Sequence, residues 1–88
     1  MNVEFTPQAL EDLRWFIQRD VRTAERIVKL IEDVRRSPFE GIGKPEPLKG
    51  DLSGWWSRRI DGEHRLVYRL VEAGGAARVQ VAQGRYHY

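Results

Sequence analysis

Three side chains in the second half of the chain, Glu46, Arg65 and His87, are of the types that phosphodiester cleavage requires. Attack of a 2′-hydroxyl on the neighbouring phosphate needs a base that removes the hydroxyl proton and an acid that protonates the departing 5′-oxygen. It also needs a fixed cation where negative charge accumulates on the phosphate. A carboxylate, a histidine and an arginine can supply these three functions to RNA without a metal ion.

Glu46 is the candidate base because its backbone is unusually restricted. Pro45 fixes its own φ angle, and Pro47 disfavours the helical region for the residue before it. A carboxylate on such a stiff segment is held in place at low entropic cost. Taken alone, Glu46 also fits a solvated loop glutamate, which is the more common situation for this residue type.

Arg65 is the candidate cation, since arginine stays charged and can grip a phosphate with two donors. It alternates with apolar positions, so it should face away from the core, although an exposed strand arginine without a role fits equally well. His87 is the candidate acid because histidine titrates near neutral pH. Tyr86 and Tyr88 flank it with rings that can stack on bases. His64 is the competing histidine, and its parity places it in the core-facing or rim set.

Basic residues around these candidates suggest a polyanionic partner. Residues 1–43 hold 7 Lys+Arg against 8 Asp+Glu, a balance of −1, whereas residues 44–88 hold 8 against 5, a balance of +3. Such a bias is moderate and hints at nucleic acid. The expected phosphate contacts are those of Lys44, Lys49, Arg58 and Arg59.

Length and composition restrict the class of protein. A chain of 88 residues predicts a single domain covering residues 1–88. The absence of cysteine excludes disulfides and thiolate metal sites, and two histidines make a weak metal site, so we expect no metal and no cofactor. No apolar run reaches the ~20 residues that span a bilayer, and no signal-peptide pattern is present. We therefore expect a cytoplasmic protein that does not associate with membranes.

The first half predicts a short extended segment followed by a helical hairpin. Thr6 and Pro7 form a helix start, Asp20 is a second cap, and Ser37-Pro38 ends the second helix. The expected apolar positions of the first helix are Ala9, Leu10, Leu13, Phe16 and Ile17. Those of the second are Val21, Ala24, Ile27, Val28, Ile31 and Val34.

The second half predicts a loop and then strands. Residues 38–50 contain three prolines and three glycines, which indicates a structured loop rather than helix or strand. Alternating apolar residues predict strands at about 55–60, 64–72 and 76–83, joined by Asp61-Gly62 and Gly74-Gly75 turns. The fold class is then α+β: an antiparallel sheet of about four strands with the helical hairpin packed on one face, in the order β-α-α-β-β-β.

The turn after Asp61 decides which arginine faces the candidate site. A two-residue loop pairs Ile60 with Glu63 and sets Arg58 opposite Arg65, whereas a three-residue loop sets Arg59 there. Local turn chemistry favours the first arrangement. We expect the second, because it agrees with the family resemblance that covers this segment.

Ordered motifs carry that resemblance: RRSPFEG, GKPEPLKG, LSGWWSRRI, EHRLVY and the final RYHY. The chain resembles the Txe/YoeB family of toxins, within the RelE-like superfamily, most weakly over residues 1–20 and 69–82. The resemblance implies that the glutamate of KPEP (Glu46) is the base, the arginine of EHRLVY (Arg65) stabilises the transition state, and the histidine of RYHY (His87) is the acid with Tyr88 beside it. Lys49 and Arg59 match residues that line the same site in relatives.

The resemblance also implies a function and partners. Proteins of this family are toxins of type II toxin–antitoxin systems. They act as ribosome-dependent endoribonucleases that enter the decoding site, cut the messenger by 2′-hydroxyl attack and so inhibit translation. The implied partners are therefore the ribosome, mRNA in its A site and a Phd/YefM-type antitoxin. A homodimer is a further arrangement that the resemblance allows.

Two functions from different classes remain at this point. The first is a metal-independent endoribonuclease, an mRNA interferase, acting on ribosome-bound mRNA. The second is a non-catalytic module that binds RNA or the ribosome and blocks translation by occupancy. Matching positions for the base, the cation and the acid favour the enzyme.

Overall fold

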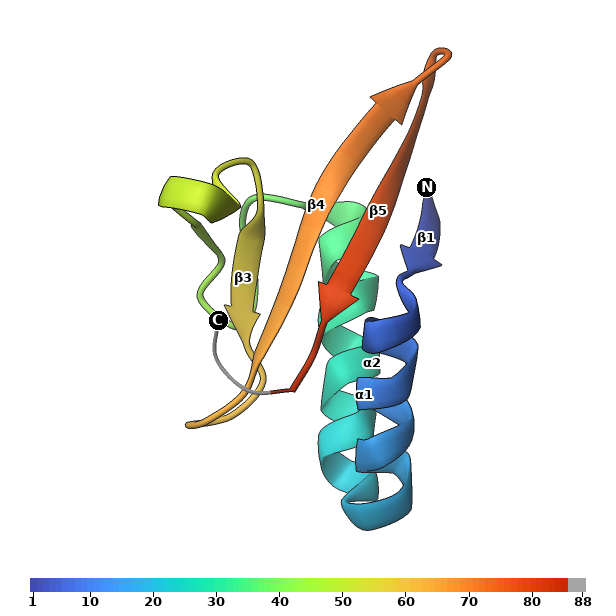
Figure 1. Ribbon diagram of the computed structural model, residues 1–88, viewed down its shortest axis with the longest axis vertical. Helices are drawn as coiled ribbons and strands as arrows, with labels where there is room; N and C mark the ends of the chain where they lie inside the picture. Colours follow the sequence, from blue (N-terminus) through green and yellow to red (C-terminus); the bar gives the residue numbers. More distant parts are fainter. Residues whose placement is uncertain (86–88) are drawn as a thin grey trace.

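The computed structural model describes residues 1–85, and residues 86–88 lie outside the described part. The predictions for His87 and Tyr88 therefore fall outside it. Two helices and a mixed sheet make up the fold (Figure 1). The elements are β1 (Asn2–Phe5), α1 (Pro7–Arg19), α2 (Val21–Arg36), β2 (Glu46–Pro47), the 3-10 helix η1 (Gly50–Leu52), β3 (Trp56–Arg59), β4 (Arg65–Ala73) and β5 (Ala76–Gln83).

Both helices begin at the caps expected from the sequence. The Thr6 side chain accepts a hydrogen bond from the backbone N–H of Ala9, and Asp20 accepts one from the N–H of Thr23. These bonds satisfy donors that the first helical turn leaves free. The helix α2 ends at Arg36, and its C-cap Ser37 directly precedes Pro38, as predicted.

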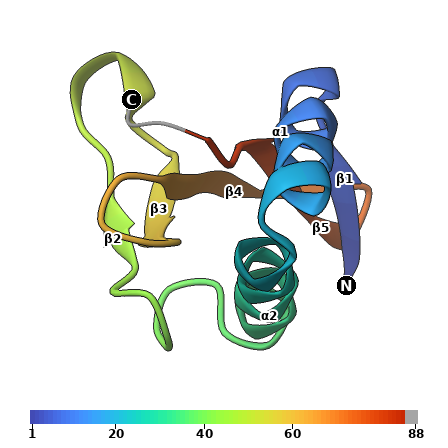
Figure 2. The same cartoon turned by 90° about the horizontal axis from the view of Figure 1, so that it is seen from below.

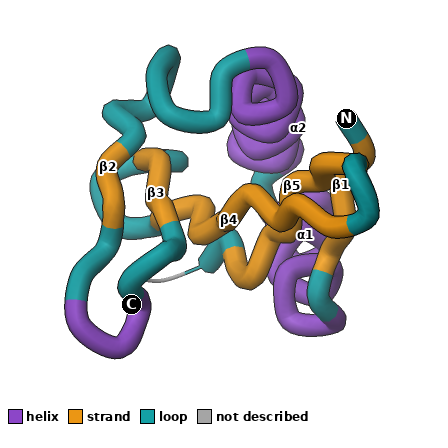
Figure 3. Tube along the Cα trace, turned by 90° about the horizontal axis from the view of Figure 1, so that it is seen from above, coloured by secondary structure: helices purple, strands orange, loops and turns teal. Residues whose placement is uncertain are grey.

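The described part of the sheet contains five strands, in the order β1-β5-β4-β3-β2 (Figure 3). The α+β class and the mostly antiparallel sheet are confirmed, but the expectation of about four strands is too low. The extra strand is β2, because Glu46 and Pro47 pair with Ser57 and Trp56 inside the segment predicted as loop. Proline is tolerated here because an edge strand needs no ladder N–H on its outer side.

The sheet is mixed because it also contains one parallel pair of strands. The strand β1 pairs with β5 in parallel, with Val3 opposite Val79 and Phe5 opposite Val81. The β4–β5 hairpin, by contrast, follows the sequence closely. Gly74 and Gly75 form its two-residue turn with φ angles of 59° and 77°, a combination that favours glycine at both positions.

The core lies between the helical hairpin and one face of the sheet, as expected. Its sheet side includes Leu66, Tyr68, Val79 and Val81, all about 1% exposed. The predicted helix faces are partly wrong. Leu10, Ile17, Val21 and Val28 are 45–60% exposed, and Leu30 is fully buried instead. Helical periodicity indicates which face of a helix is apolar. The elements that pack against this face decide which of its residues are buried.

The helices pack beside β1 and β5, at one edge of the sheet, and leave the edge formed by β2 and β3 open. Figure 2 shows α1 and α2 beside β1 and β5, with β2 and β3 extending away from them. No helix in residues 1–85 has the length and apolar character needed to cross a membrane. The open part of the sheet carries the residues singled out from the sequence.

Candidate functional site

Glu46 and Arg65 are in direct contact on the open part of the sheet. A guanidinium nitrogen of Arg65 donates to a carboxylate oxygen of Glu46 at 3.2 Å. The Glu46 side chain is 55% exposed, while that of Arg65 is 17% exposed. A reachable carboxylate thus sits against a held cation, which is the arrangement that a base and a phosphate clamp need.

Arg59 completes a basic surface around this pair. It lies directly opposite Arg65 in the β3–β4 ladder, so the two arginines share a face of the sheet. Like charges in directly opposed positions destabilise an antiparallel pair. The arrangement therefore favours an anion at this place. Lys44 and Lys49 are exposed on the segment that contains Glu46, and so can add phosphate contacts at its margin.

The turn before β4 explains why Arg59 rather than Arg58 faces the site. The carboxylate of Asp61 accepts hydrogen bonds from the N–H groups of Glu63 and His64, at 2.8 Å and 2.7 Å. The N–H of Ile60 donates to the carbonyl of His64. This Asx-type loop of three residues gives the register that the family resemblance favoured, and that prediction is confirmed.

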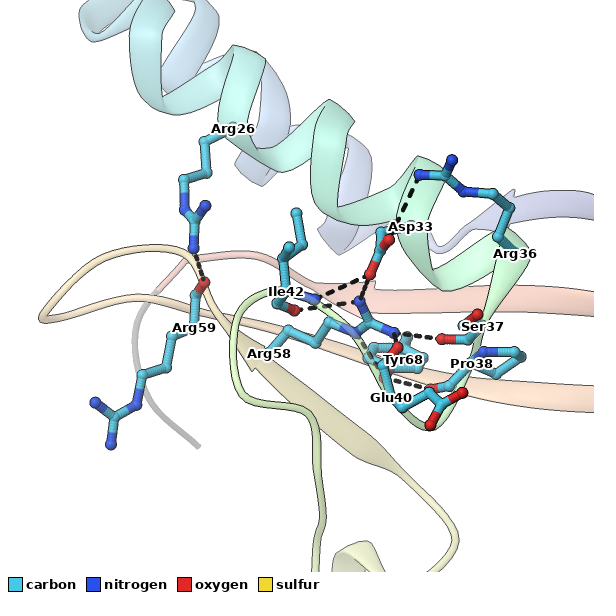
Figure 4. A network of polar contacts seen from close by, with 10 residues as sticks. All are labelled: Arg26, Asp33, Arg36, Ser37, Pro38, Glu40, Ile42, Arg58, Arg59 and Tyr68. Carbon is cyan, nitrogen blue, oxygen red and sulfur yellow. Dashed lines mark hydrogen bonds and ion pairs between the residues drawn. The ribbon is translucent and has the colours of Figure 1, made fainter.

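Arg58 points the other way, and the expectation that it contacts phosphate is wrong. Its side chain is 0% exposed and lies on the core face of β3. Figure 4 shows its guanidinium directed into a ring of acceptors, while the Arg59 side chain extends away from them. Alternation along a strand puts neighbouring residues on opposite faces, so only one of the two arginines can reach a surface ligand.

The acceptors of Arg58 belong to the end of α2 and the loop that follows. The guanidinium forms an ion pair with Asp33 and donates to the carbonyls of Ser37, Glu40 and Ile42. Its Nε donates to the Tyr68 hydroxyl, which donates to Pro38. Three of the five Arg58 hydrogen bonds thus go to backbone carbonyls of residues 37–42 and hold this segment in place. This loop leads directly to Lys44 and Glu46.

The loop also needs close backbone approach at Gly41. A Cβ at Gly41 would lie 2.0 Å from a carboxylate oxygen of Asp33, and its φ is +125°, a region that favours glycine. The N–H of Ile42 donates to the same Asp33 oxygen at 3.0 Å. Asp33 therefore connects the loop to Arg58. We call Arg58, its side-chain partners Asp33 and Tyr68, and the loop groups that they bind the Arg58 cluster.

Hydrogen bonding and burial within the Arg58 cluster shift the pKa values of two groups. The hydrogen bond from Arg58 lowers the pKa of Asp33 below its ordinary value of 3.8, against an opposing effect of burial. Burial raises the pKa of Tyr68 above its ordinary value of 10.0. Tyr68 thus remains a hydrogen-bond donor at neutral pH.

The lowered pKa of Asp33 predicts an acid-sensitive contribution to stability. This contribution is complete above the unfolded-state pKa near 3.8 and is lost as the pH falls through the lower folded-state pKa. We expect the free energy of unfolding to fall between about pH 5 and pH 2, and to fall less in Asp33→Asn. Urea unfolding at several pH values across this range measures the free energy of unfolding. Asp51→Asn, at an exposed position, is the control, and an equally steep fall in Asp33→Asn would contradict the prediction.

The remaining sequence candidates occupy the places expected for packing. His64 is 7% exposed and its ring lies 5.0 Å from that of Phe16, which confirms its core-facing position. Trp56 packs against the core, whereas Trp55 lies over Arg69, with 4.5 Å between the guanidinium carbon and the ring centre. Sequence reasoning missed Asp33 and Asp12. Both are acidic residues within helices, where their spacing gives no sign of a distant partner.

Fold and site together define an α+β protein with a carboxylate–arginine pair on an open, basic sheet surface. The model of the YoeB-like toxins of bacterial type II toxin–antitoxin systems matches residues 5–88. The chain therefore belongs to this family. The toxin RelK of Mycobacterium tuberculosis is 54% identical over 87 residues, which is 99% of this chain and 98% of that protein.

Solved structures agree with this assignment. The YoeB/ParE toxin from Agrobacterium tumefaciens superposes with a TM-score of 0.94 at 46% identity, covering 100% of both chains. The YoeB dimer from Staphylococcus aureus gives a TM-score of 0.86 at 43% identity, covering 100% of this chain and 98% of that one. A chain of the heterotetrameric YoeB–YefM toxin–antitoxin complex from S. aureus gives a TM-score of 0.85, with the same identity and coverage.

Proposed function

We propose that this protein is an endoribonuclease that cuts mRNA on the ribosome and so inhibits translation. The observation that carries the proposal is the contact between Glu46 and Arg65 at 3.2 Å, with Arg59 directly across the ladder. A purely structural ion pair would not need a second arginine opposite the first. An anionic substrate accounts for this charge pattern.

The proposed chemistry uses the side chains of the protein. Glu46 accepts the proton of the 2′-hydroxyl, whose oxygen forms a bond to the adjacent phosphorus. Arg65 stabilises the charge that develops on the phosphate oxygens. The bond from phosphorus to the 5′-oxygen breaks, and His87 protonates that oxygen. The products are a 2′,3′-cyclic phosphate and a 5′-hydroxyl. Tyr88 would assist at the same site.

Binding and location follow from the same proposal. Lys44, Lys49 and Arg59 hold the phosphates that flank the scissile bond. Ribosome-bound mRNA as substrate implies action in the cytoplasm. Since S. aureus YoeB forms a dimer and a complex with YefM, we infer that this chain also forms a homodimer and is inhibited by a YefM-type antitoxin.

The test separates cleavage from blocking by occupancy. Ribosomes programmed with a defined message are mixed with protein that has been treated with chelator and then freed of it, because ribosomes need Mg²⁺. We expect new 5′ ends in the A-site codon that kinase labels directly, as 5′-hydroxyl ends do. A message with a 2′-deoxynucleotide before the scissile bond should remain intact, because it lacks the attacking hydroxyl.

Other results would lead to different conclusions. Intact message on stalled ribosomes would indicate the non-catalytic module. Cleavage of the 2′-deoxy message would exclude attack by the 2′-hydroxyl. Activity that disappears after chelator treatment and returns with added metal would contradict the metal-independent mechanism.

A further inference from the structure

Asp12 is a buried carboxylate in the middle of α1 that bonds to the last described part of the chain. It is 4% exposed, and one carboxylate oxygen accepts the backbone N–H of Gly84 at 3.0 Å. The other oxygen accepts from the side-chain amide of Gln8 at 2.7 Å. A buried carboxylate is costly unless such bonds are formed. Its place in the core face of a helix therefore needs an explanation.

The bond to Gly84 lies where the chain leaves the sheet. The strand β5 ends at Gln83, so the N–H of Gly84 has no partner in the ladder with β4. Gly84 is buried, and a buried N–H without a partner is destabilising. The Asp12 carboxylate replaces the missing strand partner, and it fixes the point from which the chain continues.

A second contact from α1 holds the next residue. The guanidinium carbon of Arg85 lies 3.7 Å from the ring centre of Trp15, within the range of a cation–π interaction. Trp15 follows Asp12 by three positions, so both side chains project from neighbouring turns of one helix face. The cap residue Thr6 adds a third contact, because its hydroxyl donates a hydrogen bond to the carbonyl of Ala82 at 2.7 Å.

These contacts converge on residues 82–85, and the proposed acid His87 follows two residues after Arg85. We propose that Asp12 is a positioning residue for RNA cleavage: by binding the N–H of Gly84, it fixes the backbone three residues before the proposed acid His87. This inference rests on the proposed function. The sequence analysis assigned no residue of helix α1 to the site, so Asp12 adds a link from this helix to the proposed chemistry.

Positioning by Asp12 predicts a loss of rate without a loss of binding. A displacement of a catalytic group by about 1 Å can cost on the order of 10²-fold in rate. We therefore expect Asp12→Ala to lower the single-turnover rate on saturating ribosomes by about 10–10²-fold. Ribosome affinity should stay within about twofold, because the phosphate contacts of Lys44, Lys49 and Arg59 are unchanged.

Two further variants distinguish positioning from general stability. Asp12→Asn keeps an oxygen that can accept from Gly84, and should restore the rate to within about threefold of the wild type. Glu11→Ala removes the same charge from an exposed position on the same helix and should have no effect on the rate. Hydrogen exchange of the Gly84 amide should accelerate in Asp12→Ala and remain slow in the other two variants.

The outcomes separate this inference from the proposed function. A wild-type protein that leaves the message intact overturns the proposed function, and this inference with it. A wild type that cleaves, with Asp12→Ala equally fast per folded molecule, overturns the inference alone. The same holds if Asp12→Asn is as slow as Asp12→Ala while its Gly84 amide stays protected.

Discussion

Replacing Glu46 with glutamine should slow cleavage of ribosome-bound message by about 10²–10⁴-fold, the usual contribution of a general base. Glutamine has nearly the same shape but does not accept a proton. The acidic limb of the rate–pH profile should therefore flatten as well. Ribosome binding should be preserved, because the lysines and arginines around Glu46 still supply phosphate contacts.

Arg65→Met provides the matched comparison, since Arg65 contacts Glu46 at 3.2 Å but has a different proposed role. Loss of one donor to the transition state costs on the order of 10²–10³-fold. Because Arg65 does not titrate in this range, the whole profile should drop while its acidic limb remains.

Single-turnover cleavage on saturating ribosomes, measured across about pH 5–9, checks both variants. An acidic limb that persists in Glu46→Gln would remove Glu46 from the role of base, provided that chemistry limits the measured step. If both variants lost binding and rate in equal proportion, the site would be one of occupancy rather than catalysis.

Replacing Arg58 with methionine should have the largest effect on stability. Removal of one partner of a buried ion pair typically costs about 3–5 kcal/mol. Here it would strand the Asp33 carboxylate and the carbonyls of Ser37, Glu40 and Ile42. Against a total of about 5–15 kcal/mol for a folded domain, a loss of this size would leave a large unfolded fraction at moderate temperature. Urea unfolding at neutral pH measures the change.

Arg59→Met is the control for this prediction, because it removes the same charge one residue away. The Arg59 side chain is exposed and has no hydrogen bond or ion pair with the residues in 1–85, so stability should change by no more than about 0.5 kcal/mol. Its binding to RNA should instead weaken, with a salt slope reduced by about one. Equal stability of the two variants would show that the Arg58 cluster does not hold the loop.

The local elements could be predicted from the sequence because short-range chemistry specifies them. Thr6, Asp20 and Ser37 mark helix ends through hydrogen bonds that span three or four residues. The glycine pair at 74–75 determines its own turn. Strand alternation separates the Arg65 face from the Tyr68 face with no knowledge of neighbouring strands. The motifs that resemble the Txe/YoeB family likewise selected Glu46 and Arg65 before any geometry was known.

Strand partners and helix rotation depended on contacts between distant parts of the chain. A parallel partner for β1 lies more than 70 residues away at β5, and no local pattern specifies it. The pairing of Glu46 with Ser57 turned a segment rich in proline into an edge strand. Val28 and Leu30 are both apolar, and packing against the sheet decided which of them is buried.

The sequence by itself determined which chemical groups are present and how their backbone is restricted. Both depend only on a residue and its neighbours along the chain. Only the tertiary structure decided that Arg59 lies opposite Arg65 while Arg58 is buried. The physical reason is that a shift of one residue in a strand exchanges its two faces. Here the Asp61 loop sets that shift, and the loop carbonyls that surround Arg58 satisfy its charge.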